Sequence, residues 1–408
     1  MKVVRLREVC LFNPPKTEAR KAISSDQLVG FMPMQDLRIG SKYVEASTSK
    51  PLGEVIKAYT YFADNDVLIA KITPCFENGK MGIARNLENG VGFGSSEYFV
   101  LRPTDSLLSE YLYYFLRQEF VIENGRGIMT GAVGHRRVPG EYLENLEIPL
   151  PPLEKQCAIV EKLDSAFAEI ELIAVKTEEE KSESKELFRQ ICKEFFQNLY
   201  PTGYSSLKDL SRVITKGTTP TSIGQNFVSK GINFLKVESL DQVGGFVENK
   251  FAFIDADCHQ VLGRSQLQKD DLLVSIAGAL GRTAMVTDEV LPANINQALA
   301  LVRLPSESKI LPQFIFSLFQ AGFFDEVVGN MSAGAAQQNL SLAQIGSFQI
   351  PILDSKQQLM FIAFIANLME CTDEFVAAMN RKKELLSELK SSVLSSVFAN
   401  DSRIVEVA

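Results

Sequence analysis

The chain has 408 residues, of which 46% are hydrophobic and 23% charged, and its formal net charge is −8. This length and composition allow two or three domains with sizeable cores and are typical of a folded, soluble protein rather than a disordered one. The six cysteines stand at no metal-ligand or redox spacing, and there are only two histidines. We therefore expect reduced thiols, no disulfide framework and no metal-centred enzyme.

Hydropathy gives no reason to expect a membrane segment. The apolar uncharged stretches at residues 310–324 and 357–369 are too short and too polar to cross a bilayer. Near the N-terminus, Arg5, Arg7 and Glu8 interrupt the apolar run that a secretory signal needs. We expect a cytoplasmic protein with no membrane partner.

The distribution of charge is more informative than its sum. Residues 1–150 carry 18 basic and 18 acidic side chains, whereas residues 151–200 carry 7 and 11. The acidity is thus concentrated in segments that are predicted below to be helical. One surface of the protein could be basic while the opposite surface is acidic. Composition alone therefore neither excludes nor identifies a nucleic-acid-binding protein.

Residues 1–150 and 201–352 both have the pattern of a mixed α/β (α+β) domain. Short β-rich runs alternate with glycine-containing turns, and an aromatic-rich helix follows in each segment. The predicted strands lie at residues 67–72, 98–101, 271–276, 283–286 and 298–302, and the predicted helices at residues 109–123 and 312–328.

The two segments form an internal repeat. Ile148-Pro149-Leu150 near the end of the first is matched by Ile350-Pro351-Ile352 near the end of the second, a shift of 202 residues. At the same shift Gln156 falls on Gln358, and further identities keep this register. One unbroken register with the same order of elements indicates a pseudo-two-fold protein that does one job at two places.

Each repeat ends in a long charged helix, predicted at residues 151–200 and 353–400. Neither helix can bury its apolar stripe alone, so we expect two antiparallel rods of roughly 65 Å, with a globular domain at each end. The polar insert 176–185 and Lys382 interrupt the seams, which leaves either a solvated face or a surface reserved for another subunit. The predicted seam residues, at heptad spacing, are Leu153, Val160, Leu163, Phe167, Ile170, Ala174, Phe188, Ile191 and Phe195 in the first helix, and Phe361, Phe364, Leu368, Cys371, Phe375, Ala378, Leu385 and Leu389 in the second.

A domain boundary belongs at the linker between the first helix and the second repeat. Pro201 and Gly203 lie there, and neither residue continues a helix cheaply. The resulting scheme has a first globular domain at 1–150, helix 151–200, a second globular domain at 201–352, helix 353–400 and a tail at 401–408.

No short motif in the sequence convincingly indicates a catalytic site. Asn13-Pro14-Pro15 resembles the motif with which adenine methyltransferases hold a flipped base, but Lys16 stands where an aromatic residue would stack on that base. The glycine-rich run 90–94 lacks a nucleotide-binding context, and we predict a turn there. Because we find no phosphate-binding loop and no nuclease cluster, we expect no enzyme activity in this chain.

Two loops that the repeat aligns are candidates for reading DNA. Residues 130–138 and 332–340 place small residues before a polar trio, His135-Arg136-Arg137 in one loop and Gln337-Gln338-Asn339 in the other. Arginine can donate twice to guanine, glutamine or asparagine can pair twice with adenine, and glycine lets the backbone approach phosphate. An ordinary polar loop is the alternative.

A second candidate element lies early in the second repeat. Lys216, Thr218 and Thr219 would suit a phosphate group, but they could also form a capped turn. The complete set of residues predicted to bind DNA is Lys80, Arg126, Thr130, Gly131, His135, Arg136, Arg137, Lys216, Thr218, Thr219, Lys236, Gln337, Gln338 and Asn339.

The overall pattern resembles the specificity subunit of a type I restriction-modification system, over almost the full length of the chain. The second copy departs from the first at Asp354-Ser355-Lys356, where the first has Pro-Leu-Glu. The segments that carry the resemblance are residues 95–103, 148–156, 214–220, 350–352 and 357–358.

The resemblance implies a non-catalytic reader of double-stranded DNA. Each domain would recognise one half of a split target, while the helices would set the gap and dock two methyltransferase subunits. S-adenosylmethionine, ATP and Mg²⁺ would be used by the methyltransferase and the restriction (translocase) subunits, with no cofactor in this chain. Half-sites about one helical turn apart, roughly 34 Å, fit a rigid spacer. The alternatives are a solitary DNA adenine methyltransferase and a coiled-coil protein adaptor.

Overall fold

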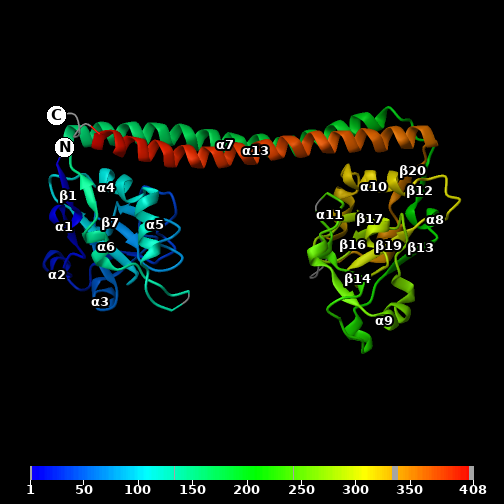
Figure 1. Ribbon diagram of the computed structural model, residues 1–408, viewed down its shortest axis with the longest axis horizontal. Coiled ribbons are helices and arrows are strands. Elements are labelled where there is room, and N and C mark those ends of the chain that lie inside the picture. Colours follow the sequence, from blue (N-terminus) through cyan, green and yellow to red (C-terminus); the bar gives the residue numbers. More distant parts are fainter. Residues whose placement is uncertain (1, 133, 242, 333–338, 404–408) are drawn as a thin grey trace. The chain divides into compact units, whose positions relative to one another are not determined.

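The computed structural model describes residues 2–132, 134–241, 243–332 and 339–403 (Figure 1). The chain forms two compact units: unit 1 contains residues 1–177 and 381–408, and unit 2 contains residues 178–380. Each unit has a mixed α/β lobe and one segment from each long helix, which confirms the predicted fold class. Because the units divide both helices, the scheme of separate domain and helix segments stays a prediction.

Lobe 1, the globular part of unit 1, is built on two main sheets. Their strand orders are β2-β10-β7-β8-β4 and β5-β3-β9-β6, and a small sheet pairs β1 with β11. The strands are β1 Val3–Arg5, β2 Cys10–Phe12, β3 Leu28–Met32, β4 Tyr43–Val44, β5 Thr48–Pro51, β6 Thr60–Ala63, β7 Val67–Ala70, β8 Met81–Ala84, β9 Val91–Gly94, β10 Tyr98–Pro103 and β11 Glu147–Pro149. The helices are α1 Leu6–Val9, α2 Thr17–Ala22, α3 Leu52–Val55, α4 Ser109–Leu116, α5 Glu119–Gly127 and α6 Gly140–Glu144.

Lobe 2, the globular part of unit 2, has corresponding sheets. Their strand orders are β13-β19-β16-β17 and β15-β14-β18, and β12 pairs with β20. The strands are β12 Tyr204–Ser206, β13 Val213–Lys216, β14 Ile232–Leu235, β15 Ala252–Ile254, β16 Leu272–Ser275, β17 Thr283–Met285, β18 Ala293–Ile295, β19 Leu299–Arg303 and β20 Gln349–Pro351. The helices are α8 Leu207–Leu210, α9 Ala256–Val261, α10 Pro312–Gln320, α11 Asp325–Ser332 and α12 Leu342–Gly346.

The centre of each lobe is a fully buried strand. All four residues of β7 and all four of β16 are buried, because each strand lies between two sheet neighbours and is covered on both faces. Short apolar runs of this kind are typical of central strands. All five predicted strand regions are confirmed, with ends shifted by one or two residues.

Two sequence-based expectations about the lobes are wrong. The glycine-rich run 90–94, predicted as a turn, contributes strand β9 between β3 and β6. A β-carbon at Gly92 would collide with the Phe62 ring, so glycine there allows the close packing of buried strands. The predicted helices 109–123 and 312–328 are each two helices, broken at Gln118, which has an extended ψ of 140°, and at Gly322, which has a φ of 76°.

Both lobes contain the same buried ion pair at one end of the central strand. Asp66 precedes β7 and receives two hydrogen bonds of 2.7 Å from Arg102 at the end of β10. Asp271 precedes β16 and receives bonds of 2.7 and 2.6 Å from Arg303 at the end of β19. Both aspartates are at most 1% exposed, so the two-bond geometry compensates their loss of water.

The start of each long helix is attached to its lobe by a fully buried glutamine. α7 spans Leu153–Gln197 and α13 spans Ser355–Arg403. The Gln156 amide donates to the carbonyl oxygens of Ser106 and Pro151, and its oxygen accepts from Leu108 N at 2.9 Å.

Gln358 makes the equivalent three bonds at the start of α13. Its amide donates to Lys309 and Leu353, and its oxygen accepts from Leu311 N at 2.8 Å. The departure of the sequence at Asp354 is compensated locally, because Asp354 accepts from Gln357 N at 2.8 Å and caps the helix. The identity at Gln156 and Gln358 therefore reflects one structural role used twice.

Within each unit the two helical segments run antiparallel. In unit 1 Lys390 of α13 bonds Glu171 of α7 at 2.6 Å, and in unit 2 Lys181 of α7 bonds Asn380 of α13 at 2.9 Å. The α7 seam is confirmed except at Leu153, which is 39% exposed. Polar residues of the insert, such as Thr177, continue this seam without interrupting the helix.

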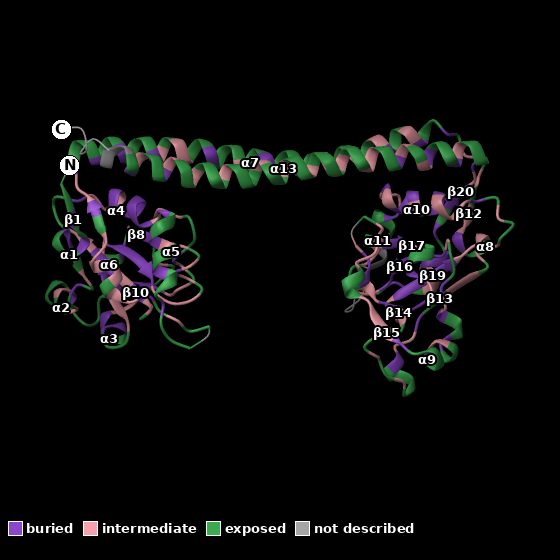
Figure 2. Cartoon of the chain, viewed as in Figure 1, coloured by how far each residue is buried: buried purple, intermediate pink, exposed green. Residues whose placement is uncertain are grey.

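The predicted α13 seam is wrong beyond its first turns. Phe375, Leu385 and Leu389 are exposed, and the less exposed stripe passes instead through Val376 and Leu386. A straight helix drifts about 20° per heptad relative to a strict seven-residue repeat, so four heptads displace the stripe by almost one residue. Figure 2 shows the resulting exposed faces of both long helices.

The helical segments are part of the lobe cores. In unit 1, Phe398 of α13 lies 5.2 Å from the ring of Tyr111 and 5.8 Å from that of Phe115 in α4. In unit 2, Phe361 of α13 packs edge-on against Phe314 of α10. Each lobe therefore needs residues from both long helices to complete its hydrophobic core.

We expect Gln358→Ala to destabilise unit 2 by about 2 kcal/mol, because it leaves one buried and two partly buried backbone groups without their partner. Amide hydrogen exchange measures the effect at a chosen site. The Leu311 N–H should exchange faster, whereas the Leu108 N–H, bonded by Gln156, should keep its protection and serves as the internal control. Equal protection of Leu311 in both proteins would contradict this role for Gln358.

Candidate nucleic-acid interface

In lobe 1, the sequence-predicted residues gather mainly where β7 ends, opposite the Asp66–Arg102 pair. The loop that contains residues 130–137 closes on itself, because Thr130 N donates to Arg137 O at 3.0 Å and Arg137 N donates to Thr130 O at 2.8 Å. Gly131 has a φ of 123°, which permits the sharp turn. Thr130, Gly131 and His135 are exposed on this loop.

The loop is attached to the end of β7 by backbone hydrogen bonds. Thr73 N donates to Arg136 O and Val138 N donates to Lys71 O, both at 2.9 Å. The backbone that carries Arg136 and Arg137 is therefore held against the sheet. Their side chains remain partly accessible, at 42% and 46% exposure.

Both arginines face glutamates at the same sheet end. Arg137 makes a two-bond contact with Glu97, with Nε at 2.9 Å and Nη2 at 2.7 Å from the carboxylate oxygens. Arg136 Nη2 lies 3.4 Å from Glu77. The hydrogen bonds from Arg137, with the positive charges of Arg137 and Lys71, lower the pKa of Glu97 below its ordinary value of 4.5. Glu97 is therefore ionised at neutral pH.

The other two predicted residues of lobe 1 lie at the edges of this surface. Lys80 precedes β8 and donates to Met34 O at 3.2 Å, so its ammonium group is already bonded to the lobe. Arg126 near the end of α5 is exposed and lies 3.5 Å from Glu123. Both are close in sequence to elements that form the loop surface, but neither belongs to the Arg137–Glu97 pair.

In lobe 2, the predicted residues gather at the equivalent sheet end. Lys216 is the last residue of β13, and Gly217 N donates to Asn296 O at 3.1 Å. The hydroxyl of Thr219 bonds the side-chain oxygen of Gln297, while Thr218 is partly exposed beside it. A β-carbon at Gly217 would collide with Ile295 O, so only glycine fits this approach of β13 to β18.

Lys236 and Asn339 reach the same sheet end from other elements. Lys236 follows β14, and its ammonium nitrogen lies 5.1 Å from the Phe227 ring centroid and 3.8 Å from Glu238. Asn339 is exposed and forms a β-bridge with Ala277 just after β16. Gln337 and Gln338 lie outside the described residues.

The backbone frames of the two surfaces are the same. Ser95 N donates to Met32 O in lobe 1 and Asn296 N donates to Leu235 O in lobe 2. The hydrogen bond from Val138 N to Lys71 O in lobe 1 has its equivalent in lobe 2. There Leu340 N donates to Ile276 O, also at 2.9 Å. The predicted equivalence of the two loops is therefore confirmed at their described ends, where Asn339 occupies the place of Arg137.

Sequence reasoning missed four residues of these surfaces, namely Lys71 and Glu97 in lobe 1 and Asn296 and Gln297 in lobe 2. Each lies in a strand-end segment that bonds to a predicted residue or carries its loop. Lys71 lies within the strand predicted at 67–72, and Glu97 directly precedes the strand predicted at 98–101. The rule that ligand-binding residues follow strand ends could have identified them.

A cleft of about 700 Å³ in unit 2 adjoins this surface. It lies between helical segments and the turn from β16 to β17, and four basic side chains line it together with Asp325 and Asp373. One of the four, Arg189, is already paired with Asp325 at 2.8 Å. The basic residues of the cleft are Lys181, Lys185, Arg189 and Arg282.

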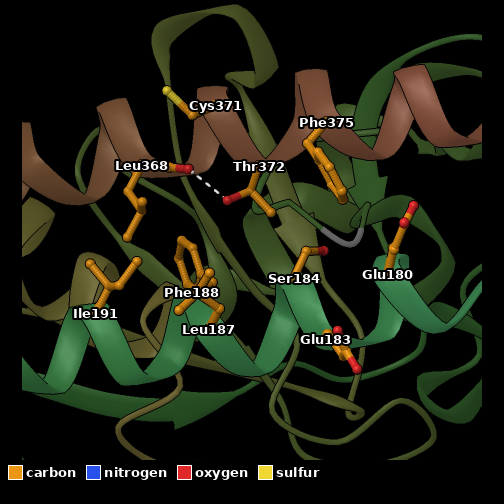
Figure 3. A pocket seen from close by; sticks show the side chains of 10 residues that line it. All are labelled: Glu180, Glu183, Ser184, Leu187, Phe188, Ile191, Leu368, Cys371, Thr372 and Phe375. Carbon is orange, nitrogen blue, oxygen red and sulfur yellow. Dashed lines mark hydrogen bonds between the residues drawn. The ribbon is translucent and has the colours of Figure 1, made fainter. Parts of the chain in front are cut away.

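A second hollow in unit 2 lies between α7 and α13. Figure 3 shows this groove of about 540 Å³, into which Phe188, Ile191 and Leu368 project from the two helices. Its lining is mainly apolar, and Leu187 and Phe375 at its border are 56% and 37% exposed. The groove thus presents apolar surface that the lobe does not cover.

The structure offers little for chemistry on a base. Asn13 accepts from Val100 N through its side chain at 3.1 Å and so belongs to the pairing of β2 with β10. Among the described residues no cluster of three potential metal ligands is found. Within the same residues, no helix has the length and apolar character needed to cross a membrane.

The described residues thus form a duplicated α/β lobe with polar strand ends and two long helices whose segments run antiparallel within each unit. Residues 1–180 match the family described as type I restriction modification DNA specificity domain. Over these residues the chain is therefore similar to the DNA specificity domains of type I restriction-modification systems.

Relatives with this name occur in bacteria and archaea. The EcoEI specificity subunit of Escherichia coli is 34% identical over 197 residues, which are 48% of this chain and 32% of the relative. The EcoAI subunit of Escherichia coli is 38% identical over 136 residues, or 33% and 23% of the two chains. These matches span about a third or less of the relatives' lengths. The MjaVIII subunit of Methanocaldococcus jannaschii is 20% identical, with 98% and 93% coverage.

Two solved structures share the fold. One comes from a study of the assembly and conformational transition of a type I restriction-modification system, and it matches with a TM-score of 0.75 and 18% identity over 97% of both chains. The other is the HsdS subunit of Thermoanaerobacter tengcongensis, with a TM-score of 0.57 and 17% identity over 98% of this chain and 97% of that one.

We expect Gly217→Ala to lower the free energy of unfolding of unit 2 by about 2 kcal/mol, because its methyl group must displace the backbone at Ile295. Urea unfolding followed by circular dichroism measures this. The matched control is Gly263→Ala, whose added methyl group meets no atom within 4 Å. Similar unfolding curves for the two variants would show that the strand ends are not tightly packed.

Proposed function

We propose that this chain is the DNA-reading subunit of a type I restriction-modification complex. Each lobe binds one half of a bipartite double-stranded target through its polar strand-end surface. The long helices set the gap between the halves and dock two methyltransferase subunits. The reactions belong to partners, with S-adenosylmethionine, ATP and Mg²⁺ used by methyltransferase and restriction subunits.

The observation that carries the proposal is the repetition of one backbone frame with different side chains. The hydrogen bonds at Ser95 and Asn296 are equivalent, but the exposed groups beside them are Arg137 in one lobe and Asn339 in the other. A shared frame suits docking on a common DNA backbone, whereas different side chains suit different base sequences. The similarity of residues 1–180 to type I DNA specificity domains supports the same division.

The electrostatics of lobe 2 are compatible with a DNA backbone despite the net charge of −8. The cleft beside its strand ends carries four basic side chains against two acidic ones. Local positive charge of this kind attracts phosphate independently of sequence. The partner subunits would add further phosphate contacts, since the lobes themselves are near neutral.

The proposal is tested by producing the chain with its cognate methyltransferase and mapping methylated adenines in the host DNA. We expect a split motif, and duplexes carrying it should bind the complex at least about a thousandfold more tightly than unrelated duplexes. The purified chain alone should bind no S-adenosylmethionine tightly. A continuous motif would contradict two separate readers. Tight cofactor binding would favour a solitary methyltransferase, and no sequence preference in either state would favour a protein adaptor.

We expect Leu187→Glu or Phe375→Glu to weaken methyltransferase binding about tenfold or more, because a charge at a docked apolar groove would be desolvated. Size-exclusion chromatography and a binding titration measure the complex. Val261→Glu is the control, since Val261 on α9 is 63% exposed and distant in sequence from the groove. Normal assembly of both groove variants would place the docking surface elsewhere.

A further inference from the structure

We propose that Arg137 reads a guanine in the half-target bound by lobe 1, and that Glu97 is the residue that positions it. This inference rests on the proposed function and deepens it, because it assigns a base to one side chain.

The hydrogen bonds of Arg137 leave a defined pair of donors available. A guanidinium group has five N–H donors in a fixed plane. In Arg137, Nε and Nη2 donate to Glu97, and Nη1 donates to His135 O at 3.1 Å. One N–H on each Nη atom is therefore left without a partner among the described residues.

This remaining pair has the geometry of a guanine reader. Two neighbouring donors of one guanidinium match the O6 and N7 acceptors that guanine presents in the major groove. The side chain is 46% exposed, so a base edge can reach it. The carboxylate of Glu97 holds the guanidinium plane before DNA binds. The backbone hydrogen bonds between Thr130 and Arg137 hold the main chain from which this side chain projects. A preoriented fork loses less freedom when it binds.

The pairing with Glu97 favours a base over a phosphate. Phosphate binding depends on net positive charge, and the ionised carboxylate of Glu97 cancels the charge of Arg137. A phosphate in contact with the fork would also be repelled by that carboxylate. The acceptors of guanine carry no net charge, so this repulsion does not arise, while the two directional donors are kept.

The equivalent position in lobe 2 carries different chemistry. Asn339 forms its bridge with Ala277 as Arg137 does with Ile72. The residue equivalent to Glu97 is Ala298, because Ile276 N donates to Ala298 O as Lys71 N donates to Glu97 O, both at 2.9 Å. Lobe 2 thus lacks the positioning carboxylate where it lacks the arginine. Asn339 therefore marks an equivalent site that has neither a guanidinium group nor a carboxylate to position one.

The test uses the complex with its methyltransferase and duplexes in which each guanine of the target is replaced, one at a time, by 7-deazaguanine. This base pairs normally but lacks the N7 acceptor. We expect one replacement in one half-target to weaken binding of the unaltered complex about tenfold to a hundredfold. The same replacement should have little effect on Arg137→Ala, because the contact is already absent.

Two further variants separate the roles of charge and orientation. Arg137→Lys keeps the charge without the planar fork, so it should lose the response to 7-deazaguanine while keeping the salt dependence of binding. Glu97→Gln should reduce the response at the same guanine only, whereas a merely structural role would weaken binding at all positions. Asn339→Ala is the matched control and should affect the other half-target.

The outcomes distinguish the inference from the function on which it rests. If Arg137→Ala weakens binding equally to all duplexes and reduces its salt dependence, Arg137 contacts a phosphate and the inference is overturned. An undiminished response to 7-deazaguanine in Arg137→Ala overturns it as well. If the unaltered complex shows no split target, the proposed function itself fails. Normal melting of the variants and intact recognition of the other half-target verify their folding.

Discussion

The attachment of each lobe to its helix depends on one fully buried glutamine. The fully buried side chains of Gln156 and Gln358 each bond three backbone groups, one buried and two partly buried, that would otherwise lose these partners. Such a side chain tolerates little displacement, because an unsatisfied buried amide is costly. The direction in which a long helix leaves its lobe is thus fixed at its first turn, and the apolar contacts of the seam follow from it.

The duplication preserves the interior and varies the surface. The Asp66–Arg102 pair is repeated as Asp271–Arg303, and the backbone bonds at the strand ends are repeated as well. The polar groups placed on this frame differ, since a charged pair in lobe 1 is matched by neutral residues in lobe 2. A protein that recognises two sequences with one architecture needs this separation, because packing constrains the core and leaves the loop side chains free to change.

Sequence reasoning identified the large-scale organisation because it leaves periodic signals. The 202-residue shift, the central strands and the α7 seam depend on patterns that extend over many residues. Predictions from the sequence failed where the outcome depends on contacts between residues distant in sequence, or on a small helical drift that adds up over many turns. The role of β9 depends on Phe62 packing on Gly92, which no linear pattern reveals, and the α13 stripe drifted away from a strict heptad. The loop with Arg137 was found, but its partner Glu97 lies 40 residues away and is brought to it by the sheet.

The contribution of α13 to unit 1 has a consequence for biosynthesis. Leu394 and Phe398 belong to the core of lobe 1, although lobe 1 itself is encoded first. At translation rates of about 5–20 residues per second, the nascent first lobe waits roughly 10–40 s while about 200 intervening residues emerge from the ribosome. Its aromatic surface on α4 stays uncovered for that interval. Maturation of lobe 1 is thereby coupled to the later synthesis of α13.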